Sequence, residues 1–154
     1  MKVFVFEHAT ALPTLSMGSF FHSPELMELY ELTPRHKPYM AVVTVDEGHE
    51  VAHLLAVARY KRSLFPPYLY THIRVIGEGV YLQEPSEQIF SLMVNALKER
   101  LQNKVLYMEF SNLSQKMFGY ETLRSEGFFP VRWMSVHNSL HSRIPEERIT
   151  AKLL

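Results

Sequence analysis

The sequence contains no cysteine, so it can form no disulfide and has no thiolate for catalysis. It also lacks an excess of charge of either sign, because 16 basic residues balance 16 acidic ones. No global field therefore attracts the chain to nucleic acid or acidic lipid. No apolar run approaches the ~18 residues of a membrane span, and the N-terminal residues do not resemble a signal peptide. The lack of a span and of a signal peptide makes a cytoplasmic protein the expectation, while the absence of cysteine leaves the redox compartment undetermined.

What is present is typical of a globular domain. Hydrophobic residues make up 47% of the chain and charged residues 21%, which are ordinary proportions. A length of 154 residues suits one domain with a sizeable core.

Residues 71–101 carry the clearest pattern in the chain. Apolar residues recur there at three- and four-residue spacing, at Ile89, Phe90, Met93, Val94, Leu97 and Leu101. This spacing predicts an amphipathic helix over 86–101 with one side on a core. Pro85 suits the first turn of that helix.

Arg74, Gly77 and Gly79 lie ahead of this helix, at the end of a predicted strand. Glycine lets the backbone turn sharply or approach a ligand closely. The three residues are therefore candidates for holding the phosphate groups of a cofactor. A glycine turn that only reverses the chain direction explains the same pattern.

The remaining patterns complete an element order of β-α-β-β-β-α-β-α-β. Strands are predicted at 2–6, 39–45, 51–60, 68–76, 105–110 and 129–140, and helices at 23–32, 86–101 and 114–126. The mostly apolar run at 105–110 predicts a strand buried on both faces. Together these elements predict an α/β (α+β) fold, in which a mixed, mainly antiparallel sheet carries helices on both faces.

Glu109 is the candidate catalytic residue, because it lies inside the apolar strand at 105–110. A partly buried carboxylate there could accept a proton from an attacking amine. A solvent-facing or ion-paired carboxylate is the alternative interpretation.

The segment 59–74 is the most basic and aromatic part of the chain. Its members are Arg59, Tyr60, Lys61, Arg62, Phe65, Tyr68, Tyr70, His72 and Arg74. Such a group could hold an anionic partner, namely a nucleotide, tRNA or a cell-wall precursor phosphate. A half-exposed strand explains it equally well, and the net charge gives tRNA no support.

The eight histidines do not predict a metal site. His137 and His141 are four residues apart but lie at a strand end, and His49 and His53 straddle a turn. Without cysteine or a His-Glu-x-x-His pattern, no metal is expected.

Two motifs resemble the GNAT acyltransferase superfamily, as does the element order. Arg74-Val-Ile-Gly77-Glu-Gly79 matches the spacing of that superfamily's Arg/Gln-x-x-Gly-x-Gly/Ala pyrophosphate loop, and Leu123-Arg-Ser-Glu-Gly127-Phe128 resembles its Tyr-x-x-x-Gly-Phe ending. The resemblance implies acetyl-CoA or another acyl donor as cofactor, with Arg74, Gly77 and Gly79 at the pyrophosphate.

Two departures point to one branch of the superfamily. The family's helix begins at the glycines, whereas residues 80–84 intervene here, and Leu123 stands where many members carry a proton-donating tyrosine. The chain thus resembles the first half of the FemAB-like peptidoglycan bridge acyltransferases, a half that commonly lacks a working coenzyme A loop.

This resemblance implies a GNAT-like domain at 1–142 and the start of a helix at 143–154 that leads into a missing second GNAT-like domain. The implied function is substrate binding in an acyl or aminoacyl transferase, with a small-molecule, aminoacyl or cell-wall precursor substrate. The alternatives are a stand-alone acetyl-CoA-dependent N-acetyltransferase and a non-catalytic binding module on the same fold.

Overall fold

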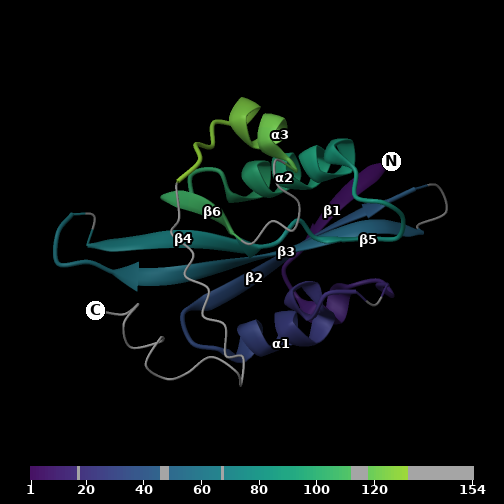
Figure 1. Ribbon diagram of the computed structural model, residues 1–154. Helices are drawn as coiled ribbons and strands as arrows, with labels where there is room; N and C mark the ends of the chain where they lie inside the picture. The colour runs from purple at the N-terminus through teal and green to yellow at the C-terminus, as the bar shows by residue number, and fades with distance from the viewer. Residues whose placement is uncertain (17, 46–48, 67, 112–117, 132–154) are drawn as a thin grey trace, which may run out of the picture.

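The computed structural model describes residues 1–16, 18–45, 49–66, 68–111 and 118–131 (Figure 1). Six strands form one sheet: β1 (Lys2–Phe6), β2 (His36–Thr44), β3 (Glu50–Arg62), β4 (Leu69–Ile76), β5 (Val80–Tyr81) and β6 (Tyr107–Ser111). The strand order is β1-β2-β3-β4-β6, and the short β5 pairs with β3. Only the β4–β6 pair of this sheet is parallel, which confirms the predicted mixed, mainly antiparallel sheet.

Helices cover both faces of the sheet, as predicted. They are α1 (Pro24–Leu32), α2 (Glu87–Leu101) and α3 (Tyr120–Ser125), with 3₁₀ turns at Ala9–Ala11 and Phe20–His22. Figure 1 shows α2 and α3 on one face and α1 on the other. The predictions of helices at 23–32 and 86–101 are confirmed to within a residue at each end. Of the helix predicted at 114–126, only the part from residue 118 onward lies within the described residues.

The C-terminal predictions lie largely outside the described residues. Residues 129–131 are described and form no strand, while the rest of the predicted strand at 129–140 is not described. The helix predicted at 143–154 also lies outside the described residues.

The larger core lies between the sheet and α2. The helix buries every apolar residue of the predicted stripe from Phe90 to Leu101, and Leu97 is fully buried. The facing residues of β3 are small or apolar, namely Ala52, Leu54, Ala56 and Ala58. Small side chains let a helix approach a sheet closely, which suits the packing of α2 on this face.

The smaller core lies under α1. Ser23 caps this helix, because its hydroxyl accepts a hydrogen bond from the Leu26 N–H at 3.1 Å. Leu26 and Met27 pack against β2 and β3, where Leu55 and Val57 are buried. None of the residues in this cluster comes from β4 or β6, so α1 covers one half of its face of the sheet.

The predicted burial of both faces of β6 is wrong. Met108 and Phe110 pack on the α2 core, but Tyr107 is 44% exposed and the Glu109 side chain 41% exposed. The strand alternates with period two, and its polar positions face the side of the sheet that α1 leaves uncovered.

Candidate functional site

Chemically useful side chains gather on the face of β3, β4 and β6 beyond α1. Residues that are paired across neighbouring strands point to the same face of a sheet. The register pairs Arg59 with His72 and Val57 with Arg74, and it pairs His72 with Tyr107 and Arg74 with Glu109 across the parallel ladder. We call this surface the open face; its polar and aromatic residues are His36, Arg59, Lys61, Tyr70, His72, Arg74, Tyr107 and Glu109.

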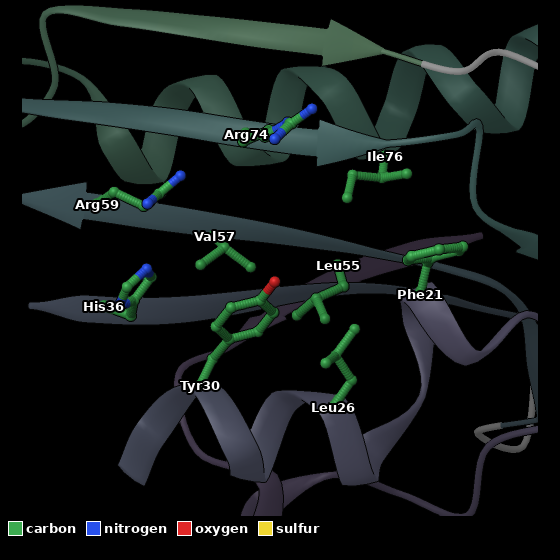
Figure 2. Close-up of a pocket in the computed structure, with 9 residues that line it drawn as sticks. All are labelled: Phe21, Leu26, Tyr30, His36, Leu55, Val57, Arg59, Arg74 and Ile76. Carbon is green, nitrogen blue, oxygen red and sulfur yellow. The ribbon is translucent and has the colours of Figure 1, made fainter. Parts of the chain in front are cut away.

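A cavity of about 210 Å³ lies where the open face meets α1. Figure 2 shows its nine lining residues: Phe21, Leu26, Tyr30, His36, Leu55, Val57, Arg59, Arg74 and Ile76. Arg59 and Arg74 project from neighbouring strands at one side, and the aliphatic residues of β3 lie below (Figure 2). The Tyr30 ring stacks on the His36 ring with centroids 5.6 Å apart, and this contact holds Tyr30 in place. Among the residues that the structure describes, neither arginine side chain forms an ion pair or a hydrogen bond.

Glu109 and His72 form a pair beside the cavity. The His72 Nε2 lies 3.1 Å from a Glu109 carboxylate oxygen, and the imidazole stacks on Tyr107 with centroids 4.3 Å apart. Burial lowers the pKa of His72, and the positive charge of Lys61 adds to the shift, while Glu109 opposes it. The ring is therefore neutral near pH 7 and donates its Nε2–H to the carboxylate. Glu109 is thus oriented by His72 and partly exposed, so a ligand on this face can reach its carboxylate.

The glycine segment between β4 and β5 makes close contacts with two other strands of the sheet. Gly77 and Gly79 have φ angles of 84° and 100°, a conformation that favours glycine. The Gly77 N–H donates to the Ser111 carbonyl at 2.7 Å, so this amide is already used. A Cβ at Gly79 would lie 2.6 Å from the His53 carbonyl oxygen. The close approach that Gly79 permits is therefore an approach to β3.

The first turn of α2 carries a carboxylate. Glu87 is the first residue of the helix, and its side chain accepts a hydrogen bond from the Gly119 N–H at 3.2 Å. The short strand β5 separates the helix from the glycines, as the intervening residues 80–84 predict. A phosphate group at this helix end would meet the negative charge of Glu87, which offsets the attraction of the helix dipole.

No family model matches the sequence, and no curated protein matches it. Solved structures do match. A ribosomal-protein-alanine N-acetyltransferase from Brucella melitensis biovar Abortus 2308 matches with a TM-score of 0.51 and 11% identity over 90% of this chain and 98% of that one. The chain has a GNAT-like mixed α/β fold.

Two further structures support the same fold at similarly low identity. A tetramutant of the BH1408 protein from Bacillus halodurans has a TM-score of 0.57 and 10% identity over 76% of this chain and 74% of that one. A transcriptional regulator from Bacillus halodurans C-125 has a TM-score of 0.52 and 12% identity over 74% and 73% of the two chains. The likeness at such identity concerns the fold and leaves the activity to be argued from the site.

The motif resemblance aligns one residue of α3 with the tyrosine that many GNAT superfamily members carry as a proton donor. Leu123 occupies that position and packs partly on the α2 core. Tyr120 lies one turn earlier, and its hydroxyl lies 3.4 Å from the Arg124 guanidinium. The described residues contain no group of three histidines or carboxylates able to hold a metal ion. None of the helices in the described part of the chain is long and apolar enough to cross a membrane.

A buried polar cluster at the other end of β3 was not found from the sequence. His22 lies where β3 and β4 part, and its Nδ1 accepts a hydrogen bond from the Leu55 N–H at 3.0 Å. Burial is the largest cause that lowers the pKa of His22 to about 4, and the charge of the neighbouring His53 is the second. His53 is in turn bonded to Glu50, which also accepts a hydrogen bond from the Ser16 N–H at 2.5 Å. A lone histidine in an irregular segment carries no local signal of such long-range partners.

Proposed function

We propose that this chain is an N-acyltransferase-like domain that binds and orients the substrate of a FemAB-like acyl or aminoacyl transferase. In this proposal residues 1–142 are one GNAT-like domain, and 143–154 begin the connection to a second one. One observation carries it: the Gly77 amide, which would face a pyrophosphate in a working coenzyme A loop, is bonded to Ser111 within the sheet.

The residues of the glycine segment do not fit coenzyme A. Gly79 packs against the backbone of β3, and the helix that would supply a positive N-terminus begins with Glu87. Arg74 lies on the open face and lines the cavity under α1 together with Arg59. The arginine that the motif assigns to a pyrophosphate is therefore available to an acceptor substrate.

The open face supplies one of the groups that acyl transfer to an amine requires. The reaction needs a base for the amine, donors for the oxyanion and a proton for the leaving group. Glu109, oriented by His72, is the candidate base for an amine bound in front of β4 and β6. Leu123 cannot donate a proton, so the second GNAT-like domain would supply the leaving-group proton and the acyl donor site.

Calorimetric titration with acetyl-CoA tests this proposal against a stand-alone acetyltransferase. We expect no saturable heat, because the Gly77 amide is bonded to Ser111 and the first turn of α2 carries the negative charge of Glu87. Micromolar binding that Arg74→Gln weakens at least tenfold, and that the control Arg62→Gln leaves unchanged, would overturn the proposal. A substitution of Gly79 is not a suitable probe, because its clash with the His53 carbonyl would disturb the sheet itself.

The non-catalytic module is the remaining alternative, and Glu109→Gln separates it from the proposal. In the protein that contains both GNAT-like domains, we expect this substitution to reduce the acyl transfer rate by 10²–10⁴-fold, the usual contribution of a general base. An unchanged rate would show that the open face only binds.

A further inference from the structure

We propose that the cavity under α1 binds a small ligand that combines a carboxylate with a short aliphatic body. Arg59 and Arg74 would pair with the carboxylate, and the aliphatic body would lie on the apolar floor of the cavity. Only the role of this ligand rests on the proposed function: it is the carboxylate-bearing end of the acceptor substrate, and the reacting amine lies elsewhere in that substrate.

The two arginines are placed to act on one anion. Arg59 lies opposite His72, and Arg74 lies opposite Val57, so the two arginines are diagonal neighbours on adjacent strands. Diagonal neighbours on adjacent strands lie roughly 7–8 Å apart, within reach of long side chains. Both side chains line the same cavity (Figure 2). A guanidinium forms bidentate hydrogen bonds with a planar carboxylate, and two of them can clamp a single group.

The positive charge at the mouth of the cavity is not neutralised by the nearest carboxylate. Glu109 is the register partner of Arg74 on β6. Its carboxylate is bonded to the His72 Nε2, however, and no ion pair joins it to either arginine in the described part of the chain. Two neighbouring cations without a counter-ion repel metal cations and favour an anionic ligand.

The floor of the cavity requires an apolar part of the ligand. Leu55, Val57 and Ile76 come from the strands, and Leu26 and Phe21 come from α1 and the turn before it. A bare inorganic anion would leave these surfaces in contact with water. An apolar cavity of about 150 Å³ holds benzene, so about 210 Å³ admits an aliphatic amino-acid side chain.

Tyr30 adds a neutral polar group to the same space. Figure 2 shows its ring beside the cavity with the hydroxyl directed toward β3. A phenol can donate to a carboxylate or accept from an amide N–H. The arrangement of two cations, one hydroxyl and an aliphatic floor matches an N-acylated amino acid or a peptide C-terminus better than a phosphate.

Titration with N-acetyl-leucine, followed by NMR of the isolated domain, tests the site. N-acetyl-leucinamide has the same body without the charge, and inorganic phosphate is an anion without the body. We expect saturable shifts at the methyl groups of Val57 and Ile76 with N-acetyl-leucine, at least tenfold weaker binding of the amide, and no shift of these methyls with phosphate. Equal binding of the acid and the amide, no saturable shift with the acid, or tighter binding of phosphate would each overturn the proposal.

Charge variants locate the binding on the protein. Arg59→Gln and Arg74→Gln should each weaken N-acetyl-leucine binding about tenfold or more. Arg62→Gln is the matched control, because Arg62 lies on the same strand as Arg59 but at a position that faces the other side of the sheet. An equal effect of all three variants would indicate a nonspecific charge effect and overturn the site. Binding of acetyl-CoA in the separate titration would overturn the half-enzyme proposal and leave this site intact.

Discussion

The two faces of the sheet differ although the same strands build both. Along β3, the residues on the α2 face are Ala52, Leu54, Ala56 and Ala58, which are all buried against apolar neighbours. The residues on the α1 face begin with His53, Leu55 and Val57 and end with Arg59 and Lys61. The α2 face is apolar from Ala52 to Ala58 and ends in the exposed Tyr60 and Arg62, whereas the other face is already charged and exposed at Arg59.

The lengths of the covering helices explain this difference. The helix α2 has 15 residues and α1 has 9, which correspond to about 22 Å and about 13 Å. The strand β3 has 13 residues and extends roughly 43 Å. Neither helix is as long as β3, and the shorter α1 leaves more of its face uncovered, so charged residues begin at Arg59 on that face and only at Arg62 on the other. The α2 face therefore supplies stability, and the α1 face keeps exposed polar groups that are free to bind.

Of the variants considered, Leu97→Asp should cause the largest loss of stability, because it alters the α2 face. Leu97 is fully buried on the α2 face, and an unpaired carboxylate there should cost on the order of 4 kcal/mol or more, a large part of the stability of a domain. Leu92 is the matched control on the same helix, because it is 40% exposed. Urea denaturation should show an unfolded or strongly destabilised Leu97→Asp and a nearly unchanged Leu92→Asp. Similar midpoints for the two variants would show that α2 does not pack as described.

Acid should lower the stability of the protein by protonating His22, which lies on the α1 side of the sheet. The pKa of His22 is about 4 in the folded protein and about 6.5 when the chain is unfolded. The unfolded state therefore binds more protons between these values, and the free energy of unfolding should fall by roughly 3 kcal/mol as the pH drops from about 6.5 to about 4. Burial also lowers the pKa of His72, so protonation of His72 should add to the loss of stability in acid.

Variants of single histidines test this assignment through the slope of stability with pH. His22→Gln should flatten the slope between pH 6.5 and 4, whatever its effect on stability at pH 7. His8→Gln should keep the slope, because the His8 side chain is 70% exposed. An unchanged slope in His22→Gln would assign the acid sensitivity to other groups.

The sequence predicted the α2 face better than the α1 face, because local periodicity determines the first. The stripe from Phe90 to Leu101 is a property of one segment, and it placed the helix to within a residue. The open face depends on register between strands that are far apart in sequence. The basic segment predicted a cluster, but the register puts Arg62 on the opposite side from Arg59, and pairs Arg59 instead with Arg74 as its diagonal neighbour.

For the glycine motif too, the sequence predicted a local property but not the contacts made by distant parts of the chain. The pattern predicted that Gly77 and Gly79 adopt an unusual backbone conformation, and both have positive φ. It could not reveal what approaches them. The neighbours are the carbonyls of Ser111 and His53, which belong to other strands, and so the proposed ligand role of the glycines is still a prediction.

Gly79→Ala should measure that close approach. Its Cβ would meet the His53 carbonyl oxygen at 2.6 Å, in addition to the strain of a positive φ, and should cost about 2 kcal/mol or more. Gly127→Ala provides the control, since Gly127 also has a positive φ of 86° but no atom within 4 Å of the new Cβ. We expect a loss of about 1 kcal/mol there from backbone strain alone. Equal losses in thermal or urea denaturation would show that β3 moves away from Gly79 without cost.

The smallest expected effect on stability is at the open face itself. Arg59 and Arg74 are exposed and form no ion pair among the described residues, so the double variant Arg59→Gln, Arg74→Gln removes only repulsion between two like charges. Exposed substitutions of this kind change the free energy of unfolding by less than about 0.5 kcal/mol, and the sign here should be neutral or stabilising. A melting temperature that is equal or slightly higher, measured at low salt where repulsion is least screened, is the expected result. A clear loss of stability would mean that the arginines support the fold, and it would remove the distinction between a face that stabilises and a face that binds.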